Sequence, residues 1–182
     1  MIRLFTGLSV PVLLRQRLAL LQGGIDGARW TPRENYHITL TFVGDVDEGM
    51  AEDAHDALSS IRVEPFKLEL KGTGAFVQGK DVYVLWVGVE YNEVLHRLKE
   101  KIDRAFEKAG VQFENRKYVP HVTLARFAKS APEAKIGEFM REHNLFSGDP
   151  FEVNEFILYR SNLSKSGSHY EEMAQYPLMA KL

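Results

Sequence analysis

Two short runs of the chain repeat the same order of a histidine, an apolar residue, a threonine and a leucine. The first copy is His37-Ile-Thr39-Leu, and the second, His121-Val-Thr123-Leu, lies in the second half of the chain. Side chains in a β-strand alternate between its two faces, so each histidine shares a face with the threonine two residues later. Two matched His-Thr pairs predict one polar cleft that is lined from both sides.

Two histidines that face one cleft can divide acid–base work, because imidazole titrates near neutral pH. A neutral ring can take a proton from a nucleophile while a protonated ring gives one to a departing oxygen, as phosphodiester cleavage requires. The threonine hydroxyls can donate hydrogen bonds to the non-bridging phosphate oxygens, where charge builds in the transition state. The repeated motif therefore indicates phosphoryl chemistry with two reacting histidines and two orienting threonines.

Two other interpretations of the motif stay open at this point. Each His-Thr pair can be a polar strand face with a satisfied histidine, and one copy alone would favour that interpretation, but repetition at equivalent places needs two accidents. A catalytic metal is the second alternative. Only His37 and His121 recur, no acidic residue shares the motif face, and neither an HExxH motif nor a cysteine pair is present. The sequence therefore favours chemistry without a metal ion.

Strict alternation makes definite predictions for the two motif strands, which we place at residues 37–43 and 121–127. In the first strand, Thr41 should share the polar face with His37 and Thr39, while the apolar residues Ile38, Leu40 and Phe42 occupy the other face. That apolar face is expected to pack against a core.

The rest of the chain reads as alternating strands and helices. Helices are expected to begin near Pro11, near Asp45 or Asp47 and at Asn92, the third ending at Gly110, and a Ser130–Glu133 capping box is expected to open a fourth. The glycines at 72 and 74 read as a turn. Further strands are expected over residues 2–8, 66–70, 82–89, 156–160 and 170–178.

The order strand, helix, motif strand, helix, strand occurs twice, which indicates a diverged internal duplication. The expected fold is α+β, with two pseudo-symmetric lobes around a central cleft, each a mostly antiparallel sheet with two helices. No low-complexity linker separates the halves, so residues 1–182 are expected to form a single bilobal domain.

Composition excludes several classes of protein. With 45% apolar and 26% charged residues the chain has the makeup of a soluble globular protein, and with no cysteine it has no disulfide or thiolate nucleophile. The formal net charge of −2 argues against wholesale binding of duplex nucleic acid. No segment approaches the roughly 20 apolar residues that span a bilayer. We expect a cytoplasmic protein without a membrane partner.

The motifs and their surroundings resemble the two-histidine phosphoesterase superfamily, and within it the RNA 2′,3′-cyclic phosphodiesterase branch, also called 2′-5′ RNA ligase. The similarity spans nearly the whole chain, and two motifs in this order are far more specific than one. The flanking residues that carry it are Arg3-Leu-Phe, Trp30, Asn35-Tyr-His37, Phe42-Val-Gly44, Pro120-His121-Val-Thr-Leu-Ala-Arg126, Leu158-Tyr-Arg-Ser161, Gly167 and Tyr170.

The resemblance implies metal-independent opening of a terminal 2′,3′-cyclic phosphate on RNA, or on a cyclic nucleotide, to a 2′-phosphomonoester. It implies no cofactor, and in some members a reversible 2′-5′ ligation. We hypothesise that His121 is the proton acceptor that activates water and His37 the proton donor to the leaving 3′ oxygen; the sequence leaves the reverse assignment open. Thr39 and Thr123 become phosphate ligands.

Arg126 is carried over from the family as a phosphate-binding cation. It lies five residues after His121, so strict alternation would turn it away from the cleft, and a bulge or the end of the strand must re-aim it. The expected protein is a monomer. A non-catalytic module that binds RNA ends or nucleotide phosphates through the same clefts is the alternative function.

Overall fold

The structure is a computed structural model that describes residues 1–78, 81–129, 131–164 and 167–179. Ser130, the expected first residue of a capping box, lies outside the described residues. No helix in the part of the chain that the structure describes has the length and apolar character needed to cross a membrane.

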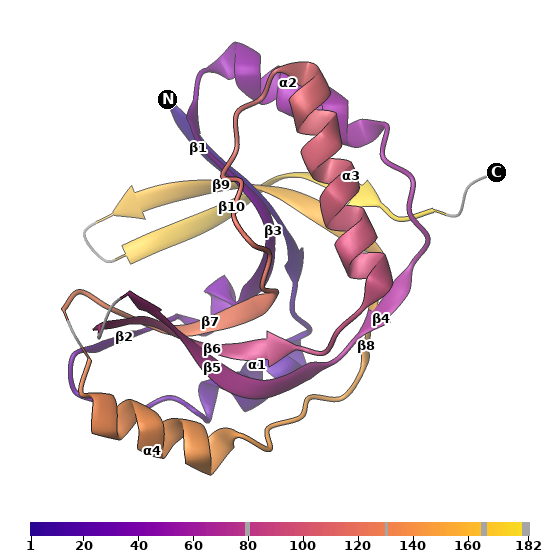
Figure 1. The fold of residues 1–182 in the computed structure, drawn as a ribbon. Coiled ribbons are helices and arrows are strands. Elements are labelled where there is room, and N and C mark those ends of the chain that lie inside the picture. The colour runs from indigo at the N-terminus through magenta and orange to yellow at the C-terminus, as the bar shows by residue number, and fades with distance from the viewer. Residues whose placement is uncertain (79–80, 130, 165–166, 180–182) are drawn as a thin grey trace.

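A long antiparallel sheet forms the centre of the molecule (Figure 1). Its strand order is β10-β9-β1-β3-β7-β6-β5, with β2 paired to β7, and β4 and β8 form a separate two-stranded sheet. The strand bounds are β1 (Ile2–Ser9), β2 (Ala28–Trp30), β3 (His37–Val46), β4 (Phe66–Leu68), β5 (Leu70–Gln78), β6 (Asp81–Val89), β7 (His121–Phe127), β8 (Phe151–Val153), β9 (Glu155–Ser164) and β10 (Gly167–Pro177). The predicted α+β fold with mostly antiparallel strands is confirmed.

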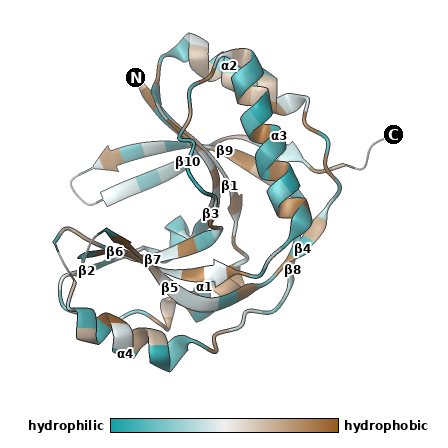
Figure 2. Cartoon of the chain, in the orientation of Figure 1, coloured by the Kyte–Doolittle hydropathy of each residue, from teal (hydrophilic) through white to brown (hydrophobic). Residues whose placement is uncertain are grey.

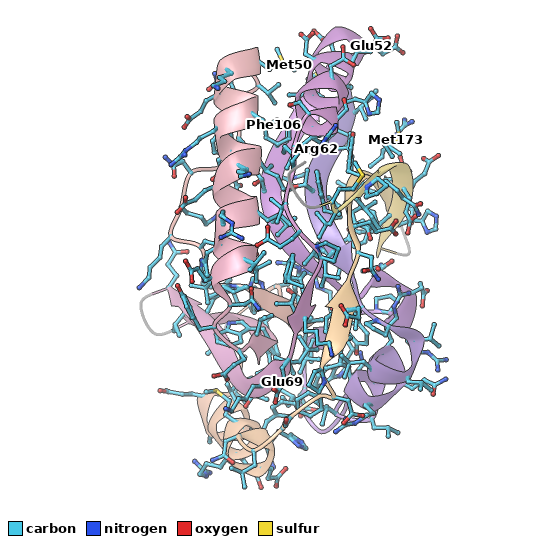
Figure 3. All side chains as sticks on the ribbon, turned by 90° about the vertical axis from the view of Figure 1, so that its right-hand side faces the viewer. Met50, Glu52, Arg62, Glu69, Phe106 and Met173 are labelled. Carbon is cyan, nitrogen blue, oxygen red and sulfur yellow. The ribbon has the colours of Figure 1, made fainter. Side chains whose placement is uncertain are left out.

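The helices gather in two groups at opposite ends of the molecule, as Figures 1 and 3 show. α2 (Glu48–Ser59) and α3 (Glu93–Ala109) lie side by side next to β1 and β3, whereas α4 (Glu133–His143) packs near β5 and β6. α1 (Val12–Ala19) belongs to the second group, because its Arg17 donates a 2.7 Å hydrogen bond to the Ser147 carbonyl in the segment beside β5. Each lobe therefore has two helices, as predicted.

The lobes do not coincide with the two halves of the sequence. α3 follows β6 in the chain but packs with α2 on the other lobe, and α1 precedes β3 but lies with α4. The carboxyl-terminal strands β9 and β10 join β1 rather than β5. The two lobes are thus interleaved, and each half of the chain contributes to both.

Local sequence signals set the ends of α2 and α3 where they were expected, whereas α4 has Pro132 as its N-cap and not in its first turn, without a side-chain cap among the described residues. The Asp47 carboxylate accepts a 2.8 Å hydrogen bond from the Met50 amide, and the Asn92 side chain accepts one of 2.9 Å from the Leu95 amide. Gly110 ends α3 in the left-handed conformation at φ 74°. Figure 2 shows bands of hydrophilic and hydrophobic residues along α3, whose buried side consists of apolar residues and Lys99.

The two motif strands join the lobes at one narrow point. β3 and β7 pair antiparallel through Ile38 and Val122, which are both 0% exposed. Each residue stands directly after its motif histidine, so the two motifs meet at the join between the lobes. This is the pair through which β3 and β7 are joined, and both of its residues belong to the buried cluster that includes residues of the two lobes.

Each motif strand carries a bulge at its leucine. On β3 the partners of Thr6 and Gly7 are Thr41 and Thr39, so Leu40 is the extra residue, and on β7 the pairing skips Leu124 in the same way. After each bulge the alternation of faces is reversed. Of the two alternatives for Arg126, a bulge or the end of the strand, the structure contains a bulge in the second motif strand, and the first strand has its counterpart.

The first bulge makes the predicted faces of Thr41 and Phe42 wrong. Thr41 is 1% exposed and points into the protein, where its hydroxyl donates to Asp103, whereas Phe42 is only partly buried and lines the cleft. Strict alternation failed here because one inserted residue changes the side of every residue that follows.

The expected turn at the glycines of residues 72 and 74 is also wrong, because both lie inside β5. Gly72 has φ +69° at an irregularity in the pairing with β6. A Cβ on Gly74 would lie 2.2 Å from the Trp86 ring, so the glycine makes room for this indole. The two glycines mark a bulge and a close approach rather than a reversal of the chain.

Candidate active site

The first motif histidine is held by its own backbone. The Nδ1 of His37 lies 2.8 Å from the Asn35 carbonyl oxygen, which can only accept a hydrogen bond, so Nδ1 carries a proton. In the neutral ring this leaves Nε2 as an acceptor, and Nε2 lies 3.0 Å from the Thr39 hydroxyl. Asn35 in turn is anchored through its side-chain amide, which donates a 2.7 Å bond to the Ser168 carbonyl of β10.

The second motif histidine is held in the same way. The Nδ1 of His121 lies 2.7 Å from the carbonyl oxygen of Val119, again the residue two positions earlier. Both histidines begin their strands, and the carbonyl two residues before each one fixes the same tautomer. The shared arrangement makes Nε2 the unprotonated nitrogen of both neutral rings, and in His37 this nitrogen lies beside the Thr39 hydroxyl.

Aromatic rings fix the orientation of both imidazoles. Tyr170 of β10 meets the His37 ring edge to face at 5.0 Å and 84°, and Phe76 of β5 meets the His121 ring at 4.8 Å and 86°. Phe5 and Trp86 pack further against the first and second ring. These contacts hold each ring between a backbone carbonyl and an aromatic side chain.

Burial lowers the pKa of both imidazoles. The pKa of His37 falls from 6.5 to about 4, mainly because burial disfavours the cation, although the bond to Asn35 opposes this. The positive charge of Arg126 lowers it further, as does that of His121 when its ring is protonated. The pKa of His121 is also lowered, first by burial and then by Arg126 and Arg116. Both rings are therefore neutral at pH 7 in a site where cations gather.

The cleft beside the motifs has a volume of about 770 Å³, which is within the range of small-molecule sites. Of the predicted site residues, Thr39, His121 and Arg126 line it; His37 is not among the described lining residues but is hydrogen bonded to Thr39, which is. Thr123 is half-buried opposite Trp86 and is not among the described residues that line the cleft. The remaining lining residues are Arg3, Leu40, Thr41, Phe42, Phe76, Val84, Lys99, Glu114, Arg116, Lys117, Tyr118, Val119, Ser161, Leu163, Ser168 and Tyr170.

The bulge on β7 turns Arg126 to the cleft. Leu124 and Ala125 are both fully buried, and Arg126 is exposed. Its partner across the ladder to β2 is Arg29, so two arginines occupy directly opposite positions on neighbouring strands. Like charges in such positions repel. An anion between or beside them would relieve this repulsion, which makes the face a favourable place for a phosphate.

Side chains from three other elements hold the bulge on β3. The Tyr118 hydroxyl donates to the Thr39 carbonyl at 3.1 Å, and the Thr41 amide donates to the Thr6 hydroxyl at 3.0 Å. The Thr41 hydroxyl donates to Asp103 of α3 at 2.7 Å. A bulge leaves backbone groups without ladder partners, and Tyr118 and Thr6 satisfy two of them. The bond from Tyr118 thereby fixes the backbone of Thr39.

Asp103 also holds a buried cation. Its other carboxylate oxygen accepts a 2.5 Å ionic hydrogen bond from Lys99, which is 8% exposed and lies 5.6 Å from the Tyr118 ring. Among the described residues, no group of three or more His, Cys, Asp or Glu side chains could hold a metal ion.

The sequence of this chain is similar to those of known proteins. Residues 16–164 match the family model of the 2′-5′ RNA ligase superfamily. This chain belongs to the 2′-5′ RNA ligase superfamily. The match includes both motifs, so the family resemblance that the sequence indicated is confirmed.

Several similar members of the superfamily carry the name RNA 2′,3′-cyclic phosphodiesterase. The protein of that name from Aeropyrum pernix is 35% identical over 77% of this chain and 80% of its own length. The one from Methanothermobacter thermautotrophicus is 31% identical over 97% of this chain and 99% of its own. The similarity to the second protein therefore extends over both lobes.

Solved structures of similar shape cover almost the whole length of this superfamily member. A protein of Thermus thermophilus superposes with a TM-score of 0.81 at 26% identity, over 99% of this chain and 100% of the other. LigT of E. coli, solved with 3′-AMP, gives 0.77 at 22% identity over 97% and 98% of the two chains. At this identity, the similarity to LigT shows that the two proteins share a fold.

Sequence reasoning missed the residues that support the motifs in this member of the superfamily. Phe76 fell just after the expected turn, and Tyr118, Asp103 and Lys99 belong to a loop and a helix far from the first motif in sequence. One signal was available: Lys99 and Asp103 are four residues apart and face the buried side of a strongly amphipathic helix, where an ion pair is unusual.

Proposed function

We propose that this protein hydrolyses the terminal 2′,3′-cyclic phosphate of an RNA strand to a 2′-phosphomonoester by metal-independent acid–base catalysis. The chain is a cyclic phosphodiesterase, given its superfamily and the relatives of that name. The observation that best supports the proposed mechanism is the matched pair of histidines, His37 and His121, in which Nδ1 is bonded to a backbone carbonyl and Nε2 is the nitrogen that can exchange a proton with a substrate.

The fixed tautomers suit the two proton transfers. Nε2 of neutral His121 accepts a proton from water as the water oxygen bonds to phosphorus, and Nε2–H of protonated His37 donates to the 3′ oxygen as its bond to phosphorus breaks. The products are a free 3′-hydroxyl and a 2′-phosphomonoester. Each ring ends in the protonation state that the other had, and exchange with solvent restores both.

Substrate binding supplies the charge that this mechanism needs. Both histidine pKa values are lowered in the free protein, and an anionic phosphodiester beside the rings raises them, since it favours the cationic form. One ring can then be protonated near neutral pH. Thr39, Thr123 and Arg126 are proposed to donate hydrogen bonds to the non-bridging oxygens, where charge increases in the transition state.

The same site can run a 2′-5′ ligation if a 5′-hydroxyl replaces water. The hydroxyl oxygen bonds to phosphorus, His121 accepts its proton, and the 3′ oxygen leaves with the proton of His37. The product is a 2′-5′ phosphodiester, and the reverse sequence of transfers cleaves it. We propose this as a second, reversible activity.

The proposed protein is a cytoplasmic monomer that uses no cofactor. The cysteine-free composition fits a reducing compartment, and the proposed reaction consumes only water and the RNA end.

Phosphorus NMR provides the deciding experiment. Incubation with a nucleoside 2′,3′-cyclic phosphate in the presence of EDTA should replace the cyclic diester signal by that of a 2′-monoester. Binding without any monoester would instead support the alternative, a non-catalytic module for RNA ends. Activity that is lost in EDTA and restored by a divalent ion would overturn the metal-independent mechanism, and a 3′-monoester would overturn the proposed direction of ring opening.

A further inference from the structure

The cleft extends further along β3 than one reacting phosphate requires. It is lined by Thr39 and Phe42, which lie two and five residues after His37 in β3. At the usual rise of a strand, the five residues from His37 to Phe42 correspond to about 15 Å. This length leaves room for a stretch of the substrate beyond its terminal phosphate.

The segment between α3 and β7 forms a wall of this extension. Its Glu114 amide donates a 2.9 Å hydrogen bond to the Phe42 carbonyl, and its Tyr118 hydroxyl donates one of 3.1 Å to the Thr39 carbonyl. Arg116 and Lys117 lie between these two anchors. The segment is thus held alongside β3 at both ends, and both cations line the cleft.

The extension has a strong excess of positive charge. Arg3 of β1 reaches across the Phe42 ring, with its guanidinium carbon 5.3 Å from the ring centroid, and lines the cleft together with Arg116 and Lys117. Glu114, the acidic residue of the lining, forms an ion pair with Arg116. The whole chain has a net charge of −2, so the local excess does not reflect a generally basic protein.

We propose that Arg3, Arg116 and Lys117 form a binding site for the internucleotide phosphates of a single RNA strand that ends in the cyclic phosphate. This inference rests on the proposed function and extends it. Phosphate contacts of this kind add affinity without reading bases, so the site favours an oligonucleotide over a cyclic mononucleotide of the same terminal base. Selectivity for length, rather than for sequence, follows.

The test compares two substrates that share their reacting end. One is a nucleoside 2′,3′-cyclic phosphate, and the other is an oligoribonucleotide that ends in the same nucleotide. For the Arg3→Gln and Arg116→Gln variants, kcat/KM on the oligonucleotide should fall about tenfold more than on the mononucleotide, the size expected for one charged hydrogen bond. Each variant should also lower the salt dependence of oligonucleotide binding by about one phosphate contact.

Arg104→Gln is the matched control. Arg104 is an exposed residue of α3 that pairs with Glu100 at 3.8 Å and does not line the cleft. Its replacement by glutamine removes one positive charge, as the two test substitutions do. The control should leave the ratio of the two kcat/KM values unchanged. Losses on the oligonucleotide no larger than those of the control, or equal losses on both substrates, would overturn the phosphate site.

Binding keeps this test separate from the catalytic proposal. The Kd of a fluorescent oligoribonucleotide with a 2′-phosphate end can be measured by anisotropy, whether or not the protein turns over any substrate. Weaker binding by Arg116→Gln, with binding by Arg104→Gln unaltered, supports the site even if the hydrolysis proposal fails. Equal binding by wild type and Arg116→Gln contradicts the site even if hydrolysis is observed.

Discussion

Each reacting histidine is defined by a short local arrangement. A strand begins at the histidine, the carbonyl two residues earlier accepts the Nδ1 proton, and an aromatic ring packs edge to face against the imidazole. The motif sequence accounts for the first of these features directly, since its period-two pattern predicts a strand with histidine and threonine on one face. The aromatic partners come from distant strands, so the motif alone does not reveal them.

Replacement of either histidine should abolish most of the activity. His37→Gln and His121→Gln each remove one proton transfer, and kcat should fall by on the order of 10²-fold or more. The rate of monoester formation from a cyclic nucleotide measures this. His55→Gln is the control, because His55 lies on α2 and bonds to Tyr176 away from the cleft. Full activity in both motif variants would contradict the two-histidine mechanism.

The lowered pKa of His37 predicts that acid destabilises the protein. The folded state holds this group near pKa 4 and the unfolded chain near 6.5, so the neutral ring contributes stability that is complete above pH 6.5. That stability is lost as the pH falls toward 4, and it amounts to at most about 3 kcal/mol.

Chemical denaturation between pH 4 and 7 measures this contribution. The free energy of unfolding should fall more steeply with decreasing pH in wild type than in His37→Gln, which lacks the titrating group. Parallel curves for the two proteins would show that His37 titrates normally in the folded state.

At the scale of single elements, the bulge in each motif strand decides which side chains reach the cleft. The predicted role of Arg126 conflicted with alternation, so the sequence required either a bulge or the end of the strand before this residue, and the structure contains a bulge. No such conflict pointed to the bulge at Leu40, so Thr41 and Phe42 were placed on the wrong faces. A bulge depends on partners outside the strand, here Tyr118 and Thr6, which the strand's own sequence does not contain.

Loss of the Tyr118 hydroxyl should therefore reduce catalysis. Tyr118→Phe removes the donor to the Thr39 carbonyl, so the threonine is positioned less well, and kcat should fall several-fold with a smaller change in KM. Steady-state kinetics on a cyclic nucleotide separates the two constants.

Tyr176→Phe provides the matched control for stability. Tyr176 is a buried tyrosine whose hydroxyl bonds to His55 on α2 at 2.7 Å, so its loss should cost a comparable amount of folding free energy. It should leave kcat unchanged. If the two variants had equal kcat values, Tyr118 would be only structural.

At the scale of the whole molecule, the two lobes are interleaved. Pattern and element order predicted two lobes with two helices each, and this is what forms, but the assignment of α1 and α3 to lobes did not follow from their places in the sequence. α3 lies on the lobe opposite its neighbouring strands β6 and β7, and α1 lies on the lobe opposite β1, which precedes it. Such long-range packing depends on which faces fit together, and no local pattern encodes it.

Interleaving leads us to propose that the chain unfolds as one domain. One cluster of buried side chains includes Leu8 and Ile38 of one lobe together with Val87 and Val122 of the other. Thermal unfolding followed by circular dichroism and by calorimetry should give one transition, with equal calorimetric and van't Hoff enthalpies. Two resolved transitions would mean that the lobes are separate domains.

Imidazoles from both motif strands are proposed to act on one phosphorus atom, and every other step of the mechanism depends on this. A crystal structure with a bound nucleoside 2′-monophosphate, the proposed product, tests it directly. We predict that Nε2 of His37 and Nε2 of His121 both lie about 2.6–3.2 Å from oxygen atoms at the reacting centre, one of them a phosphate oxygen and the other the 3′-hydroxyl or a second phosphate oxygen. A phosphate that contacts only one of the two rings, or that binds away from both, would contradict the two-histidine mechanism.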